Sequence, residues 1–231
     1  MKRWILIIPV LLLTAAISFS QPADSISFKK LETSFRIRSL TLPVSLIAYG
    51  FVTLDQPALK RLNVSTKNEI REDHPRFRTH IDNYIQYSPA FAVYGLNALG
   101  VKGKNNFRDR TMLFLISEFF MGASVTLLKK VAHQLRPDSS DYYSFPSGHT
   151  ATAFAGAEFL RQEYKDVSPW IGYAGYGIAT ITGILRMYNN KHWLSDVITG
   201  AGFGILSTRA AYWIYPSVKR KLFREKNVTV Y

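Results

Sequence analysis

Apolar residues are concentrated in separate segments along this chain of 231 residues. After an apolar N-terminal run, these segments occupy approximately residues 39–54, 85–101, 111–130, 147–162, 168–187 and 193–215. Several reach the ~17–25 residues that a membrane-spanning helix needs. The pattern predicts an all-α, membrane-embedded helical bundle of about five to six core helices. A soluble all-α protein with buried helices would give a similar profile, so hydropathy alone leaves both interpretations open.

Four charged residues interrupt the apolar segments, namely Glu118, Glu158, Asp196 and Arg209. In lipid, such groups have to face the interior of the bundle or a wet cavity. Small residues in the stretch GYAGYGIATITG, at 172–183, favour close packing between helices. Both features agree with the membrane interpretation.

The N-terminus has the pattern of an export signal. MKRWILIIPVLLLTAAISFSQ combines a basic start, an apolar run and the small residues Ser18 and Ser20. Cleavage after Ser20 and retention as a membrane anchor are both compatible with it, and either would export the segment after residue 20. The chain therefore divides into a signal peptide or anchor at 1–20, an exported polar segment at 21–84, a helical core at 85–218 and a basic tail at 219–231.

Basic residues in the connecting segments predict an orientation. Eleven lie in segments 102–110 and 161–166 and in the C-terminal tail, whereas five lie in segments 129–149 and 186–192. Because basic loops tend to stay on the cytoplasmic side, the second group of segments should face outward. With an exported N-terminus, this orientation requires that residues 39–54 do not cross the membrane, because one more crossing would reverse every later helix. We therefore expect an interfacial or re-entrant helix there.

The overall composition narrows the possible partners. A net charge of +13 suits nucleic acid, an anionic membrane surface or a phosphorylated substrate. Nucleic acid is disfavoured, because no nucleic-acid-binding motif is present and the basic residues are scattered between apolar segments. The chain has no cysteine, which excludes disulfides, zinc–thiolate sites and cysteine nucleophiles.

Two motifs in the outward segments could bind an anion. In KKVAHQLRP, at 129–137, Lys129 and Arg136 are seven residues apart and can project from one face near a helix end. In PSGH, at 146–149, the proline suits the first turn of a helix, where unpaired N–H groups and the helix dipole attract anions. Gly148 would let a ligand approach the backbone closely, and Ser147 adds a hydroxyl.

A third motif, RMYNNKHWLSD at 186–196, could supply a nucleophile. His192 and Asp196 are four residues apart, so on a helix the carboxylate can hold one imidazole nitrogen protonated and leave the other to attack. With Arg186 nearby, this arrangement suits phosphoryl transfer by a nucleophilic histidine. If the helices alternate in direction, all three motifs lie on one side of the bundle.

Together the motifs resemble the type 2 phosphatidic acid phosphatase superfamily, which also includes acid phosphatases and vanadium haloperoxidases. Its pattern is Lys-x6-Arg-Pro, then Pro-Ser-Gly-His, then Ser-Arg-x5-His-x3-Asp, and the resemblance covers about residues 85–215. The matching residues are Lys129, Arg136, Pro137, Pro146, Ser147, Gly148, His149, Arg186, His192 and Asp196. One departure is Leu185, which replaces the serine before Arg186 and removes a possible hydrogen bond near the phosphate.

The resemblance implies a metal-independent phosphatase that has no cofactor. It implies that His192 attacks phosphorus to form a phosphohistidine, that Asp196 orients His192, and that His149 protonates the leaving oxygen and then activates water. The phosphate-binding residues would be Lys129, Arg136, Ser147, Gly148 and Arg186. No carboxylate cluster near the motifs suggests a two-metal site.

The sequence also resembles envelope lipid phosphatases of Gram-negative bacteria, such as lipid A phosphatases. This implies a lipid substrate and a site that faces the periplasm from the inner membrane. Candidate substrates are lipid A phosphate, undecaprenyl diphosphate, phosphatidic acid and phosphatidylglycerol phosphate. The alternatives are an exported, soluble acid phosphatase of broad specificity, a vanadium-dependent haloperoxidase, and an inactive protein that merely binds anionic lipids.

Overall fold

The computed structural model describes residues 38–222, and the expected leader at 1–20 lies outside the described residues. All regular secondary structure in the described part is helical, which confirms the predicted all-α class. The helices are α2 (Arg38–Thr53), α3 (Pro57–Asp73), α4 (Asp82–Ile85), α5 (Ser88–Ala98), α6 (Phe107–Ala132), α7 (Gly148–Tyr164), α8 (Pro169–Tyr188) and α9 (Leu194–Leu222).

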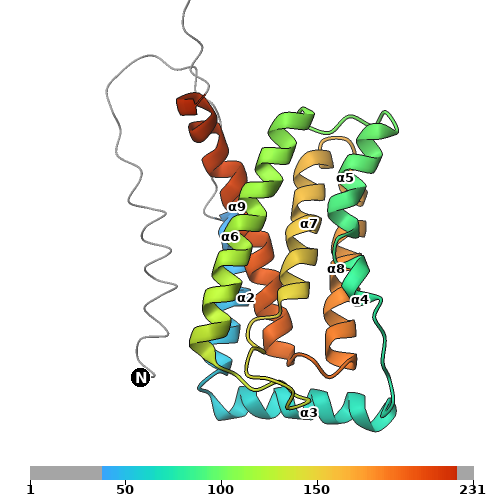
Figure 1. Cartoon of the computed structure of the whole chain (residues 1–231), viewed down its shortest axis with the longest axis vertical. Helices are drawn as coiled ribbons and strands as arrows, with labels where there is room; N and C mark the ends of the chain where they lie inside the picture. The colour runs from blue at the N-terminus through green and yellow to red at the C-terminus, as the bar shows by residue number, and fades with distance from the viewer. Residues whose placement is uncertain (1–37, 223–231) are drawn as a thin grey trace, which may run out of the picture. The chain divides into compact units, whose positions relative to one another are not determined.

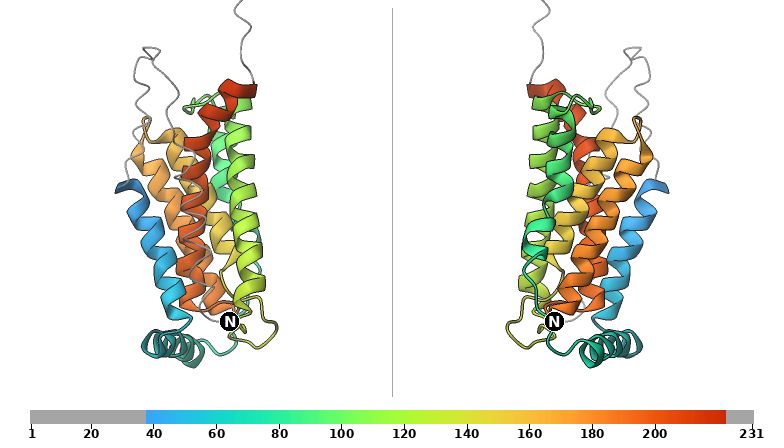
Figure 2. Two further views of the ribbon diagram at one scale, coloured as in Figure 1. Left: turned by 90° about the vertical axis from the view of Figure 1, so that its left-hand side faces the viewer. Right: turned by 90° about the vertical axis from the view of Figure 1, so that its right-hand side faces the viewer.

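Helices α5 to α9 run up and down along a common axis and form a bundle (Figure 1). α3 lies across one end of this bundle, almost at right angles to the other helices (Figures 1 and 2). We call this end the α3 end. α6 and α8 finish there, whereas α7 and α9 begin there.

α7 is the central helix, and its small side chains explain why its neighbours pack so closely. Ala151, Ala153 and Ala157 are fully buried. α9 meets α7 through glycine, because a Cβ atom on Gly204 would lie 2.3 Å from the carbonyl oxygen of Ala151. Any larger residue at position 204 would therefore force the two helices apart.

The apolar segments predicted from the sequence correspond to helices α6 to α9, with longer ends than expected for α6 and α9. α3 is a 17-residue helix within 21–84, a segment that the sequence analysis described only as polar. Its buried Asn63 ties it to α9: the Asn63 side chain donates to Oγ of Ser195 at 2.8 Å and accepts from the Ser195 N–H at 3.1 Å.

α2 packs lengthwise against α9, and it begins below the upper ends of α6 and α9 (Figure 2). A Cβ atom on Gly202 of α9 would lie 2.8 Å from the carbonyl oxygen of Pro43, so glycine permits this contact as well. The described part of the chain thus contains a helix at 39–54. Its interfacial or re-entrant placement stays a prediction.

Charged residues inside the bundle are paired. Glu158 is fully buried and binds both Arg161, at 2.6 Å, and Arg209, at 2.9 Å. The buried Arg110 and Glu163 join α6 to α7 at 3.3 Å. Glu158, Asp196 and Arg209 therefore face the interior, as their positions in apolar segments indicated, whereas Glu118 is half-buried.

The flank of the bundle carries large apolar side chains. Among the described helices, α6 is the one long and apolar enough to cross a membrane, and 28% of its most apolar stretch is buried. Exposed apolar residues on α6 and α8 include Leu115, Phe119, Leu127, Trp170, Tyr173 and Ile181. A surface of this kind is unusual for a soluble monomer.

Candidate active site

The three sequence motifs meet at the α3 end, where α6 and α8 finish and α7 and α9 begin (Figure 1). The alternating direction of the helices produces this convergence, as the sequence predicted. The connection at 133–147 and the turn at 189–193 close over the same end.

His192 lies in the turn before α9 and is buried, with a different group facing each of its ring nitrogens. Nδ1 lies 3.5 Å from Oδ2 of Asp196, an electrostatic contact too long for a good hydrogen bond. Nε2 lies 3.4 Å from Nη1 of Arg136. The imidazole is therefore oriented with Nδ1 toward the carboxylate and Nε2 toward a cation.

The Asp196 carboxylate is fixed by Ser144, which lies outside the three motifs, and by the backbone of Trp193 within the third motif. Its Oδ2 atom accepts a hydrogen bond from the buried hydroxyl of Ser144 at 2.5 Å and another from the Trp193 N–H at 2.9 Å. Its Oδ1 atom is buried and has no partner among the described residues. Two fixed hydrogen bonds give the carboxylate one orientation toward His192.

The surroundings of His192 keep its imidazole neutral. Burial lowers the pKa of His192 well below its usual range, and the nearby charges of Lys129, Arg186 and Arg136 lower the pKa further. A neutral imidazole keeps one nitrogen lone pair available, which a nucleophile requires.

Lys129 and the start of α7 lie side by side. A Cβ atom on Gly148 would lie 3.9 Å from Cε of Lys129, and Nζ of Lys129 donates to the carbonyl oxygen of Tyr143 at 2.6 Å. The backbone N–H groups of Gly148 and His149 have no hydrogen-bond partner among the described residues. A cation and two unpaired N–H groups at a helix start suit an anion.

Ser147 is the N-cap of α7, and its fully buried hydroxyl accepts from the Thr150 hydroxyl at 2.9 Å. Its backbone N–H donates to the carbonyl oxygen of Asp196 at 3.0 Å, which joins the second motif to the third. The structure thus gives Ser147 a role in positioning the helix start. Its expected contact with phosphate stays a prediction.

α4 supplies two side chains to the site that the sequence analysis missed. Asp82 is buried and pairs with Nη1 of Arg186 at 2.6 Å, while Nε of Arg186 is buried and has no partner in the described part of the chain. Asn83 accepts a hydrogen bond at Oδ1 from Nε2 of His149 at 2.8 Å. The only signal for them was a pair of adjacent polar residues just before the apolar segment at 85–101.

Ion pairs hold the connection between the first two motifs in place. Arg136 binds Asp141 at 2.7 Å and also donates to the carbonyl oxygen of Lys191 at 3.2 Å. Lys191 in turn binds Asp138 at 2.5 Å. Arg136 therefore keeps a fixed place beside His192.

A sequence model of the PAP2 superfamily matches residues 45–220, which include all three motifs and α4. The chain belongs to the PAP2 superfamily. The resemblance noted from the motifs is thereby confirmed, and the match extends further toward the N-terminus than the motifs did.

Individual relatives within the PAP2 superfamily agree with this assignment. A lipid A 1-phosphatase from Porphyromonas gingivalis is 42% identical over 139 residues, which cover 60% of this chain and 31% of that protein. A probable diacylglycerol pyrophosphate phosphatase from Schizosaccharomyces pombe is 25% identical, with 80% of each chain covered. This chain thus spans less than a third of the first relative and most of the second.

Two solved structures are similar at a lower level. The LpxE structure from Aquifex aeolicus has a TM-score of 0.48 and 22% identity, covering 63% of this chain and 93% of its own. A PAP2-type phosphatidylglycerolphosphate phosphatase from Bacillus subtilis also has a TM-score of 0.48, with 18% identity, covering 78% of this chain and 98% of its own.

Proposed function

We propose that this PAP2 protein is a membrane lipid phosphatase that works through a phosphohistidine on His192 and requires no metal ion. The observation that carries the proposal is the orientation of His192, with Nδ1 facing Asp196 at 3.5 Å and Nε2 facing Arg136 at 3.4 Å. A phosphate held by Arg136 would lie directly in front of the nitrogen that attacks.

In the first step, the lone pair on Nε2 of His192 attacks phosphorus, and the bond between phosphorus and the lipid oxygen breaks. The protonated imidazole of His149 donates its proton to that oxygen, so the lipid leaves as an alcohol. Burial and nearby cations such as Arg186 lower the pKa of His149 to about 4, and the negative charge of the bound phosphate favours its protonation for this step. Asp196 stabilises the positive charge that develops on the ring of His192 as the N–P bond forms.

In the second step, water attacks phosphorus and the N–P bond breaks. His149, now neutral, takes a proton from that water, which restores its starting state. Inorganic phosphate leaves, and the lone pair on Nε2 of His192 is regenerated. Atoms and protons balance over the two steps without a further reactant.

The negative charge of the transferring phosphoryl group would be balanced by cations and N–H groups. Lys129, Arg136 and Arg186 supply three positive charges at the α3 end, and Gly148 and His149 supply the unpaired N–H groups of the α7 start. Donors fixed before the reaction stabilise a transition state without reorganisation. Such a set can replace the charge that a metal ion would contribute.

Two observations support a substrate in the membrane. The flanks of α6 and α8 expose apolar side chains such as Phe119 (71%) and Trp170 (75%), which fit a lipid environment better than water. The relatives are named as phosphatases of lipids. We propose lipid A phosphate as the substrate and the periplasmic face of the inner membrane as the location, because the lipid A 1-phosphatase shares 42% identity over the aligned residues.

A phosphate-release assay on the purified full chain tests the proposal. The substrates are lipid A, phosphatidic acid, diacylglycerol pyrophosphate and phosphatidylglycerol phosphate in neutral detergent with excess EDTA. We expect release from at least one lipid, and loss of that release in His192→Ala at unchanged thermal stability. Release that depends on added metal ions, or that persists in His192→Ala, would contradict the proposal.

A further inference from the structure

A groove of about 690 Å³ opens at the α3 end, next to the candidate active site. One wall is the connection from α3 to α4, at residues 71–80. The opposite wall includes Asp82, Asn83, Arg186 and Lys191. We call this feature the basic groove. Arg186 belongs both to the groove and to the proposed phosphate site, so the groove borders that site.

The basic groove has an excess of positive charge. Its two carboxylates are already paired, Asp82 with Arg186 and Asp138 with Lys191. Three further cations line the groove without a carboxylate partner among the described residues, namely Arg71, Arg76 and Arg78. Arg71 donates to the carbonyl oxygen of Pro75, which keeps it at the wall.

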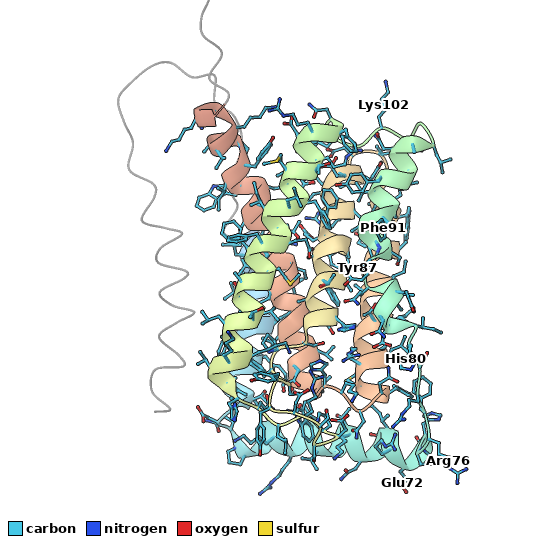
Figure 3. The ribbon with its side chains drawn as sticks, in the orientation of Figure 1. Glu72, Arg76, His80, Tyr87, Phe91 and Lys102 are labelled. Atoms are coloured by element: carbon cyan, nitrogen blue, oxygen red, sulfur yellow. The ribbon has the colours of Figure 1, made fainter. Side chains whose placement is uncertain are left out.

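Arg76 and Arg78 lie on the connection that follows α3. Figure 3 shows Arg76 beyond the end of α3 and His80 further along the same connection, on one edge of the molecule. The acidic Glu72, at the end of α3, points away from the bundle in the same view. Arg76 and Arg78 are exposed, so their guanidinium groups are accessible to a ligand in the groove.

The leaving group of the proposed reaction would enter this groove. His149 is the proposed proton donor to the leaving oxygen, and its Nε2 atom donates to Asn83. Asn83 lines the basic groove. The lipid part that leaves next to His149 therefore emerges between Asn83 and the 71–80 wall.

We propose that the basic groove is an anion subsite for the leaving group, which selects lipid phosphates that carry a second phosphate beyond the one removed. This inference rests on the proposed function. Arg76 and Arg78 form charge-assisted hydrogen bonds with that second phosphate, and Arg71 completes the subsite. The second phosphate lies either directly next to the scissile one, as in a diphosphate, or across a sugar headgroup.

The test compares the wild-type chain with R76Q/R78Q and with a matched control, K60Q/R61Q. Lys60 and Arg61 are exposed on α3 and do not line the groove, so the control removes the same charge from the same end. In the first arm, kcat/KM is measured for phosphatidic acid and diacylglycerol pyrophosphate in neutral detergent. In the second arm, isothermal titration calorimetry measures Kd for glucose 1-phosphate and glucose 1,6-bisphosphate.

Charge-assisted hydrogen bonds to a second phosphate are expected to change these preferences by about tenfold. In R76Q/R78Q we expect the preference of the wild type for the doubly phosphorylated ligand to fall about tenfold in at least one arm, with the singly phosphorylated ligand unaffected. K60Q/R61Q should behave as wild type. A change only with the diphosphate identifies an adjacent second phosphate, and a change only with the sugar bisphosphate identifies a separated one.

Three outcomes would overturn the subsite. The first is an equal change for ligands with one and two phosphates, and the second is an equal effect of K60Q/R61Q. The third is a preference for the doubly phosphorylated ligand that stays unchanged in both arms in R76Q/R78Q. If the wild type hydrolyses no lipid, the proposed function fails, whereas the calorimetric arm still decides whether the groove binds a second phosphate.

Discussion

The two ring nitrogens of His192 have different partners, and this difference decides which of them can react. Asp196, anchored by Ser144 and by the Trp193 N–H, faces Nδ1, so Nε2 is left to face Arg136. The ring is buried, and its pKa is held well below the usual range by that burial and by nearby cations. The same features that suit His192 to the proposed role of nucleophile also oppose its protonation.

A pH dependence of stability results from the low pKa of His192. Between the lowered pKa of the folded state and the unfolded value near 6.5, only the unfolded chain binds a proton here. The contribution of His192 to stability is therefore complete above pH 6.5. As pH falls below 6.5, the free energy of unfolding decreases by about 1.4 kcal/mol per pH unit at most. Unfolding in neutral detergent at pH 7.5 and 5.5 should show a smaller loss for His192→Asn than for wild type. Parallel losses would contradict the pKa assignment.

Asn83 is predicted to position His149 as the proton donor. Asn83→Ala should lower kcat for a lipid phosphate roughly tenfold or more, a part of the roughly 10²–10⁴-fold that a general acid contributes. An aryl phosphate needs little protonation of its leaving oxygen, so its hydrolysis should change much less. Asn68→Ala, at an exposed position of α3, is the control. Equal losses on both substrates would assign Asn83 a merely structural role.

Residue spacing predicted that His192 and Asp196 would face each other, although His192 lies in the turn before α9 and not on the helix that the spacing assumed. The partners Asp82, Asn83 and Ser144 could not be predicted in the same way. Asp82 contacts Arg186 across 104 positions of the chain, and Ser144 contacts Asp196 across 52. Contacts of this length depend on how whole helices pack, which no local pattern encodes.

At the scale of elements, α6 and α7 are joined by a buried ion pair at the end opposite α3. Arg110 and Glu163 are each about 1% exposed, and the guanidinium also donates to the carbonyl oxygen of Asn105 at 2.6 Å. Removing one member would leave an uncompensated charge inside the bundle. Replacing both residues by methionine would instead put two apolar side chains of similar size in place of the ion pair.

Arg110→Met is therefore expected to destabilise the fold by about 3–5 kcal/mol, whereas Arg110→Met combined with Glu163→Met should recover most of that loss. Unfolding of the single and double variants in detergent measures the difference. Arg61→Met, at an exposed position of α3, should leave stability unchanged. A double variant as unstable as the single one would show that the bundle needs the polar network itself.

The sequence predicted the long helices far better than α3. The apolar segments that form α6 to α9 are long and contain few charged residues, and their burial reinforces the local preference for helix. α3 has few apolar positions, so the sequence indicated only a polar segment there. Its stability comes instead from Pro57 at its start and from Asn63, which binds Ser195 across 132 positions of the chain.

At the scale of the whole molecule, the position of α3 changes the comparison of basic residues between the two ends of the bundle, which was used to predict the orientation. α3 and the connection after it add six basic residues to the active-site end, namely Lys60, Arg61, Lys67, Arg71, Arg76 and Arg78. The excess of basic residues at the opposite end that the sequence indicated therefore disappears. The proposed outward orientation of the site therefore depends on the export signal predicted at 1–20, and it needs a direct test.

Single cysteines can test the orientation, because the chain has no cysteine of its own. Asn68→Cys lies on α3, and Lys165→Cys lies at the end of α7 on the opposite side of the bundle. With a membrane-impermeant maleimide, we expect Asn68→Cys to be labelled in intact spheroplasts and Lys165→Cys to be labelled only after lysis. The reverse pattern would place the active site in the cytoplasm.

The phosphohistidine on His192 is tested most directly by rapid quenching of the enzyme with a lipid substrate labelled with ³²P in the scissile phosphate. We predict an alkali-stable, acid-labile label on His192, present transiently in wild type, absent in His192→Ala and accumulated in any residual turnover of His149→Ala. Phosphate release in wild type without a labelled enzyme at any time, or a label on another residue, would contradict the account.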